Sequence, residues 1–200
     1  MTRAILLLAA GASLRMRGRD KLIEDVDGKP LLRLMAERAL EVCAQVFVAL
    51  PENSPLRSNA LDGLKVTRVE VPNAKDGISA SIKTGISAIG SQSDLMILPA
   101  DLPEVTANDL AKAWRCFDQN GGEKVVRCVD KAGQIGHPVV LPGFFLARLK
   151  ALTGDQGAAP LIHSHGFVPC PLPDDHATTD LDTPEDWQDW RRKRKKIGED

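Results

Sequence analysis

The feature that most constrains the fold is an apolar run over residues 4–10, which Gly11 ends. A strand with apolar residues on both sides must be covered on both faces, and such strands are typical of parallel sheets. The run is far shorter than the roughly 20 residues that a helix needs to span a bilayer. It also lacks the cleavage-type tripeptide of a signal peptide. We therefore expect a central strand of a parallel sheet, and neither a membrane segment nor an export signal.

Helical and strand patterns alternate along the rest of the chain. The spacing of apolar residues predicts helices over residues 30–43, 79–89, 107–120 and 144–152, a short one ending at 164, and one from 184 onward. Short apolar runs predict strands over residues 46–50, 66–71, 94–100, 124–130, 137–141 and 168–172. This alternation predicts an α/β, Rossmann-like, open and mostly parallel sheet with helices on both faces, which binds its ligand at the carboxyl ends of the strands.

Length and charge exclude several classes of protein. The 200 residues suffice for one compact domain. The 26 basic and 27 acidic residues give a formal net charge of -1, so no general attraction to nucleic acid or to a membrane surface is expected. Four widely spaced cysteines (Cys43, Cys116, Cys128 and Cys170) match no zinc or redox motif. We expect reduced thiols and a cytoplasmic protein.

The loop after the first strand carries the residues of a phosphate site. Gly11 and Ser13 are small enough for backbone amides to approach a phosphate, and Arg15 and Lys21 can neutralise its charge. The loop is neither a Walker A motif nor the GxGxxG fingerprint of dinucleotide-binding proteins. It therefore predicts a nucleotide site of another family.

The segment resembles the LAAGxSxRM…KL signature of the nucleotidyltransferases that act on molybdenum cofactor. It is most similar to the cytidylyltransferase branch, because Ala9-Ala10-Gly11 stands where the guanylyltransferases usually have Ala-Gly-Gly. Arg17 departs from the pattern, since the family usually has glycine directly after Arg-Met. Further motifs continue the resemblance over nearly the whole chain: Asp76-Gly77-Ile78-Ser79-Ala80-Ser81, Pro99-Ala100-Asp101-Leu102-Pro103, Gly136-His137-Pro138, Leu152-Thr153-Gly154-Asp155-Gln156-Gly157 and Asp180-Leu181-Asp182-Thr183-Pro184-Glu185-Asp186.

The resemblance implies one domain of the nucleotide-diphospho-sugar transferase type over residues 1–200, with a basic tail at 191–200. It also implies a reaction in which the terminal phosphate of molybdenum cofactor (molybdopterin) attacks CTP, giving the cytosine dinucleotide and pyrophosphate. The attacking group is already an anion, so catalysis needs positioning and neutralisation by Mg²⁺ and by basic side chains rather than a Ser-His-Asp triad.

The resemblance assigns roles to particular residues. Lys21 and Arg15 are expected on the triphosphate, and Asp101 is expected to be catalytic as a Mg²⁺ ligand. Asp180 or Asp182 is the expected second ligand, with Asp180 favoured because related sugar nucleotidyltransferases keep only the first acidic position. Base and ribose are expected at Ala9, Ala10, Gly11, Gly77, Ser79 and Ser81, with Leu8, Ser13, Pro99 and Ala100 nearby, and the pterin at Gly136, His137, Pro138, Gly154, Asp155, Gln156 and Gly157.

Structural interpretations of the same residues stay open. Ser13 is also a candidate helix cap, and Asp101 is a candidate turn residue. One of Asp180 and Asp182 is a candidate for a purely structural role, because Thr183 and Pro184 form a good helix start. His137 is a candidate buried strand histidine. We assign no zinc to His163 and His165, expect Trp187 and Trp190 to pack, and expect the basic run 191–196 to be solvated.

Other functions also stay open. A guanylyltransferase, or a transferase for another phosphorylated acceptor, keeps the same chemistry. A non-catalytic protein that binds and delivers the cofactor is a second class, with a molybdoenzyme or its maturation chaperone as partner. An oxidoreductase ranks last, because the dinucleotide fingerprint is absent from the sequence.

Overall fold

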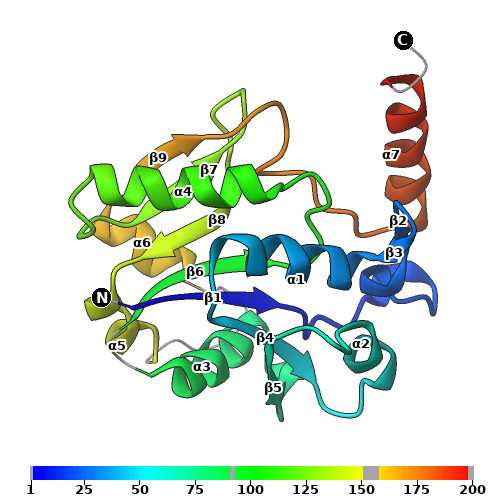
Figure 1. Ribbon diagram of the computed structural model, residues 1–200, viewed down its shortest axis with the longest axis horizontal. Helices are drawn as coiled ribbons and strands as arrows, with labels where there is room; N and C mark the ends of the chain where they lie inside the picture. The colour runs from blue at the N-terminus through cyan, green and yellow to red at the C-terminus, as the bar shows by residue number, and fades with distance from the viewer. Residues whose placement is uncertain (1, 91–92, 151–157, 198–200) are drawn as a thin grey trace.

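A computed structural model of the protein describes residues 2–90, 93–150 and 158–197, and within them the main sheet has seven strands in the order β5-β4-β1-β6-β8-β7-β9 (Figure 1). β8 runs antiparallel to its neighbours β6 and β7, and the other neighbouring strands are parallel. The predicted open, mostly parallel sheet is confirmed. Its strands are β1 (Thr2–Leu8), β4 (Val46–Pro51), β5 (Thr67–Val71), β6 (Ser93–Pro99), β7 (Val126–Val129), β8 (Ile135–Leu141) and β9 (Val168–Pro171).

The opening apolar run forms the centre of this sheet. β1 lies between β4 and β6, and its residues from Ala4 to Leu7 are fully buried. The strand ends at Leu8, two residues earlier than predicted, because the chain turns there into the loop. Ala9 and Ala10 remain buried at the start of that loop, which explains their apolar character.

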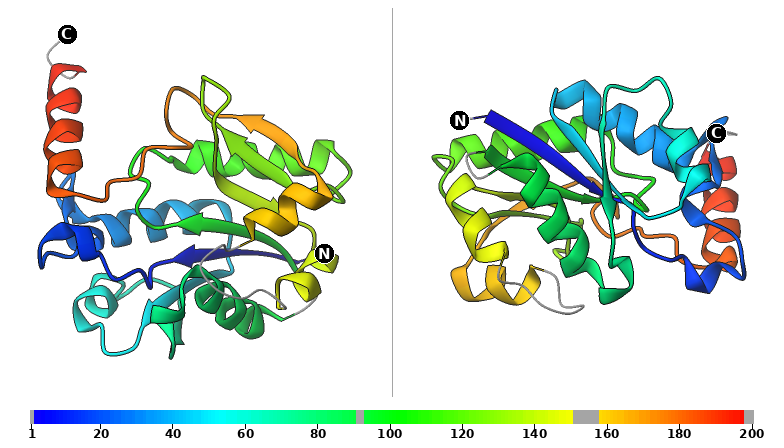
Figure 2. Two further views of the ribbon diagram at one scale, coloured as in Figure 1. Left: turned by 180° about the vertical axis from the view of Figure 1, so that it is seen from behind. Right: turned by 90° about the horizontal axis from the view of Figure 1, so that it is seen from below.

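Helices cover both faces of the sheet, as predicted (Figure 2). On one face, α1 (Leu31–Val42) and α4 (Ala107–Gln119) pack their apolar sides onto the strands. On the other face lie α3 (Ile78–Ile89), α5 (Leu146–Leu149) and α6 (Ala159–His165). The two sides of each buried strand therefore enter two separate cores.

Several short elements were not predicted. They are the helix α2 (Pro55–Ala60), the hairpin of β2 (Asp25–Val26) and β3 (Lys29–Pro30), and the 3-10 turns η1 (Leu14–Met16), η2 (Lys21–Ile23), η3 (Ala74–Asp76) and η4 (Gly143–Phe145). The helix predicted over residues 144–152 begins instead as η4 and continues as α5 to Leu149. Such elements are too short to complete an apolar period.

The last helix, α7 (Pro184–Ile197), stands at one end of the sheet beside the β2–β3 hairpin (Figure 1). Thr183 caps it as expected, because its hydroxyl accepts the Asp186 amide at 3.1 Å. Trp187 and Trp190 are buried, which confirms their packing role. The basic run is only partly solvated, since Arg191 bonds Glu24 and Arg194 bonds Asp27, each at 3.0 Å. These pairs lie between the helix and the residues of the hairpin region.

All four cysteines are free thiols, and Cys43, Cys128 and Cys170 are buried. Among the helices of the described ranges, none has the length and apolar character that crossing a membrane requires.

Candidate active site

The loops that follow β1, β4, β5 and β6 meet at one edge of the sheet, because these four strands are parallel. Two adjoining cavities open at this edge. They share Ala10, Gly11 and Ala12 from the first loop, and Ala74 and Lys75 from the turn η3. The predicted site is therefore a hollow region in the place that the topology requires.

The first cavity, which we call the Lys21 cavity, has a volume of about 550 Å³. It gathers residues from three separate predicted motifs. Of the predicted residues, Leu8, Ala10, Gly11, Lys21, Gly77, Ser81, Pro99 and Asp101 line it, and the remainder of its wall is Ala12, Leu14, Leu22, Ala74, Lys75 and Ile78.

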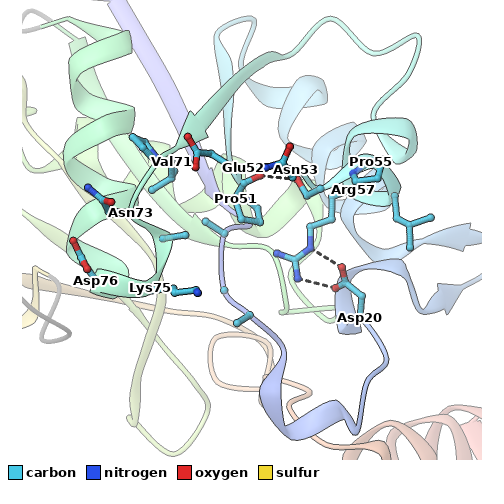
Figure 3. Close-up of a pocket in the computed structure, with 17 residues that line it drawn as sticks. Asp20, Pro51, Glu52, Asn53, Pro55, Arg57, Val71, Asn73, Lys75 and Asp76 are labelled. Carbon is cyan, nitrogen blue, oxygen red and sulfur yellow. Dashed lines mark hydrogen bonds and ion pairs between the residues drawn. The ribbon is translucent and has the colours of Figure 1, made fainter.

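The second cavity, which we call the Arg57 cavity, has a volume of about 760 Å³ (Figure 3). Its wall comes from the loop after β1, from residues 51–57 and from residues 71–76. Ala10 and Gly11 are the predicted residues among its lining, whereas Asp20, Asn53, Arg57 and the rest were not predicted. Together the two cavities offer room for a ligand of nucleotide size.

Lys21 is the centre of the charged part of the site. Its ammonium bonds the carboxylate of Asp101 and, at 2.6 Å, that of Asp182. Burial alone would lower the pKa of Lys21, but the two carboxylates more than offset this, so its pKa lies above the usual value. Lys21 is thus a fixed cation that links the first loop to the end of β6 and to the approach to α7.

The acidic residues before α7 lie around this lysine. Arg15, which is mostly exposed, also bonds Asp182. Asp180 contacts neither cation, yet burial and the nearby Asp182 and Asp101 raise its pKa. The structure therefore brings Asp182, rather than the favoured Asp180, into direct contact with Lys21.

The carboxylates next to Lys21 are ligands of the kind that Mg²⁺ binds in proteins. Three acidic, His or Cys side chains do not converge on one point anywhere in the described part of the chain, so a closed protein cage is absent there. Mg²⁺ is commonly held by one or two carboxylates together with waters and substrate phosphates. Asp101 and Asp182, which touch the same ammonium group, offer two such carboxylates at one point. These residues fit a Mg²⁺ ion that is shared with a phosphate ligand.

Arg57, on α2, contacts the loop that follows β1, and Figure 3 shows its contacts with Asp20 of that loop. Its guanidinium pairs with Asp20 through Nε at 2.6 Å and Nη2 at 2.9 Å, and donates to the Ala9 carbonyl at 2.6 Å. Ser13, in a left-handed conformation, accepts from Arg57 Nη2 at 3.2 Å and donates to Asp20 at 3.3 Å. The structural interpretation of Ser13 as a helix cap is wrong, because its hydroxyl caps no helix amide.

Several other predicted residues do not line either cavity. Ser79, Ala100 and Pro138 are buried. Gly136 packs directly on the backbone of Ala177. The predicted pterin residues Gly154, Asp155, Gln156 and Gly157 fall outside the described residues.

His137 has the strand position that was considered for it, while its contact with the pterin stays a prediction. It lies in β8, and its Nδ1 atom is buried with no hydrogen-bond partner among the described residues. Burial, together with the nearby Arg127 cation, lowers the pKa of His137 to about 4, while the Asp101 carboxylate opposes this shift. His137 is thus a neutral, half-buried strand histidine whose Nδ1 atom is buried, and Asp101 is close enough to influence its pKa.

Comparison with known proteins identifies the family. The profile of the MobA-like NTP transferase domain matches residues 5–168, which is most of the chain. The chain belongs to this family. The match includes the first loop, Arg57, Lys21 and Asp101, and it ends before Asp182 and α7.

Relatives of this NTP transferase domain extend along its full length. It is 28% identical over 187 residues to the molybdenum cofactor guanylyltransferase of Cereibacter sphaeroides, covering 90% of this chain and 91% of that one. It is 26% identical to a probable molybdenum cofactor guanylyltransferase of Synechococcus elongatus, covering 94% and 97%. The solved structure of Rv0371c from Mycobacterium tuberculosis H37Rv shares the fold, with a TM-score of 0.77, 24% identity, and coverage of 95% and 98%.

Sequence reasoning missed most of the Arg57 cavity in this NTP transferase domain. The loop after β4 holds Asn53 in a left-handed conformation and leads into α2, and it lies at the same sheet edge as the predicted loops. A signal was present, because every loop that follows a parallel strand reaches that edge. The burial of Arg57 had no such signal, since an arginine in a short polar segment is usually exposed.

Proposed function

We propose that this chain transfers CMP from CTP to the terminal phosphate of molybdenum cofactor and releases pyrophosphate. The observation that carries the proposal is that Lys21 and Asp101 line a cavity together with the Gly11 loop, and that Lys21 also contacts Asp182. The molybdenum cofactor as acceptor is supported by the names of the full-length relatives.

The reaction requires no covalent intermediate with the protein, because the acceptor phosphate attacks the nucleotide directly. An oxygen of the acceptor phosphate forms a bond to the α-phosphorus of the nucleotide, and the bond from that phosphorus to the pyrophosphate oxygen breaks. Lys21 and the more exposed Arg15 supply positive charge for the triphosphate. In this proposal Lys21 exchanges part of its contact with the two carboxylates for the phosphates. The amides of the loop around Gly11 orient the nucleotide.

Mg²⁺ would be held by Asp101 and Asp182 together with phosphate oxygens. When bound, it would act as a Lewis acid that stabilises charge on the transferring phosphoryl group. The proposal predicts that chelation by EDTA abolishes turnover and that added Mg²⁺ restores it. Asp182→Asn should then lower turnover more than Asp180→Asn does, because Asp182, unlike Asp180, contacts Lys21.

The choice of base rests on two opposing observations. Ala10 lines both cavities and carries the methyl group that distinguishes Ala-Ala-Gly from Ala-Gly-Gly, which favours the smaller cytosine. The full-length relatives are named guanylyltransferases, which favours GTP. We propose CTP as the donor, with GTP as the second candidate.

Pyrophosphate release tests the proposal. The parent is assayed with Mg²⁺ and each of CTP, GTP, ATP and UTP, with and without molybdenum cofactor. Release should require both CTP and the cofactor. Asp101→Ala should reduce it by about 10²–10³-fold, the typical effect of losing one group that stabilises transition-state charge. Asp118→Ala is the matched control, because Asp118 also pairs with a cation, Arg3, but lies on α4 away from both cavities.

Other outcomes select other functions. Turnover with GTP in place of CTP would support the same mechanism with GTP as the donor. Turnover with another phosphorylated compound in place of molybdenum cofactor would show that the acceptor is that compound. Tight binding of the cofactor with no pyrophosphate release from any nucleotide would exclude a transferase and favour a delivery protein.

A further inference from the structure

Arg57 is bound to the two ends of the loop that carries Gly11 and Arg15. At the start of the loop it holds the carbonyl of Ala9, the residue that follows β1 by one position. At the end it holds Asp20, the residue directly before Lys21. The side chain therefore closes residues 9–20 into a ring through noncovalent contacts, of which Figure 3 shows those with Asp20.

The guanidinium has little capacity left for another ligand. It donates four hydrogen bonds through Nε, Nη1 and Nη2, and an arginine has five N–H groups. The Asp20 carboxylate neutralises the charge of Arg57, and the Arg57 side chain is only 5% exposed. Arg57 lines the second cavity but is poorly suited to bind a phosphate there as a free cation.

Asp20 transmits this contact to Lys21. The Asp20 carboxylate accepts the Leu22 amide at 3.0 Å and so caps η2, in which Lys21 is the first residue. Leu22 is buried in the core beneath the turn. A displacement of Asp20 would therefore shift the backbone from which Lys21 reaches Asp101 and Asp182.

We propose that Arg57 is a positioning residue that holds residues 9–21 in the conformation that binds the nucleotide. This inference rests on the proposed function for its kinetic consequence and on the geometry for its structural one. Lysine cannot replace arginine in this role, because its single ammonium cannot bridge a carboxylate, a hydroxyl and a carbonyl that lie in a fork.

A positioning role has a kinetic signature of its own. If the loop holds its binding conformation for only a fraction of the time, the apparent dissociation constant for nucleotide rises by the inverse of that fraction. Saturating nucleotide then selects the competent loop, so kcat recovers. Simple loss of folded protein has the opposite signature, since it lowers kcat per mole of chain and leaves KM unchanged.

The experiment compares Arg57→Met and Arg57→Lys with the parent. We expect both variants to raise the KM for CTP about tenfold or more, which corresponds to a competent fraction of roughly a tenth. We expect kcat to change less than about threefold, and the KM for the acceptor to stay the same. A fall in kcat at constant KM would overturn the proposal, and so would parent-like behaviour of Arg57→Lys.

Arg33→Met is the matched control. Arg33, on α1, donates to the carbonyls of Ala60 and Asp62 at 3.1 and 3.0 Å, and so holds the other end of α2 by the same chemistry. This variant should leave the KM for CTP unchanged. Asp20→Asn should reproduce the rise in KM, and it serves if the Arg57 variants fail to fold. An equal rise in Arg33→Met would mean that loosening α2, rather than the loop, is the cause.

Hydrogen exchange separates this inference from the proposed function. In the loop, the amide of Met16 bonds Ser13, that of Arg19 bonds Met16, and that of Leu22 bonds Asp20. These amides should exchange faster in Arg57→Met than in the parent, while the β1 amides do not change. Unchanged loop exchange would overturn the inference even if the parent is an active transferase. If the parent releases no pyrophosphate, the proposed function fails, and exchange still decides the role of Arg57.

Discussion

Gly11 and Gly136 both belong to predicted motifs, yet the structure requires each for a different reason. A Cβ on Gly11 would meet no heavy atom within 4 Å, so the space in front of it is open cavity. A Cβ on Gly136 would lie 2.0 Å from the carbonyl oxygen of Ala177, where it cannot fit. The first glycine leaves room for a ligand, and the second leaves room for the chain itself.

Substituting the two glycines by alanine should separate stability from activity. Gly136→Ala should lower the free energy of unfolding by about 2–4 kcal/mol, because the added methyl forces apart the backbone contact between His137 and Ala177. Gly11→Ala should change it by less than about 0.5 kcal/mol, while raising the KM for nucleotide. Urea unfolding together with pyrophosphate release measures both. A stable Gly136→Ala protein would contradict this account of the motif.

His137 should make the protein sensitive to acid. Its pKa is about 4 in the folded state and about 6.5 in an unfolded chain, so the unfolded state binds more protons between these values. Stability attributable to neutral His137 is full above pH 6.5 and falls by about 3 kcal/mol as the pH drops to 4.

The test compares urea unfolding of the parent and His137→Gln between pH 7 and pH 4. The advantage of the parent over the variant should shrink across this interval, since glutamine does not titrate. His163→Gln, at an exposed position on α6, should follow the parent throughout. A constant difference between parent and His137→Gln would contradict the prediction.

At the scale of the element, α7 attaches through two tryptophans rather than through its charges. Trp187 is 1% exposed, and its indole nitrogen has no hydrogen-bond partner within the described ranges. The ion pairs at Arg191 and Arg194 are partly exposed and worth little individually. Apolar burial therefore holds this helix against the hairpin.

Substitutions of Trp187 should show how much the stability of the protein depends on the buried indole ring. Trp187→Ala should cost about 3–5 kcal/mol of unfolding free energy, because it leaves a large cavity. Trp187→Phe should cost no more than about 2 kcal/mol, since the lost N–H made no hydrogen bond that the structure describes. Thermal unfolding of both variants, read by circular dichroism, measures the difference. Equal costs would mean that the indole nitrogen, and not the buried ring, matters.

The elements that the sequence predicted well are those with a complete apolar period. The run over residues 4–10 implied the central strand, and the strand after it ended near the predicted residue, because burial on two faces leaves few alternatives. The short helix α2 and the β2–β3 hairpin lack such a period, and neither was predicted. The candidate site was predictable where its motifs lie in loops at strand ends. Arg57 was not, because its partners are far apart in sequence.

At the scale of the whole molecule, a nucleotide that binds only the folded chain should stabilise it. At 100 times its dissociation constant, such a ligand adds about 2.7 kcal/mol. For a domain of this size that corresponds to a rise in Tm of about 5–11 °C. We expect this rise with CTP in the presence of Mg²⁺.

The variant Lys21→Ala provides the check by differential scanning calorimetry. It should unfold cooperatively without added nucleotide and show a much smaller shift with CTP, because the triphosphate loses its buried cation. A shift equal to that of the parent would place the nucleotide elsewhere. A larger shift with GTP than with CTP would support the guanylyl alternative.

The contact between Lys21 and Asp182 joins positions that are 161 residues apart. A ribosome adding roughly 5–20 residues each second needs about 10–30 s between the two. Throughout that time the nascent chain holds the Gly11 loop but lacks Asp182, Trp187 and the arginines of α7. The site is consequently completed only after Asp182 and α7 have left the exit tunnel, and a product that terminates before Asp182 carries most of the fold without the complete charge cluster.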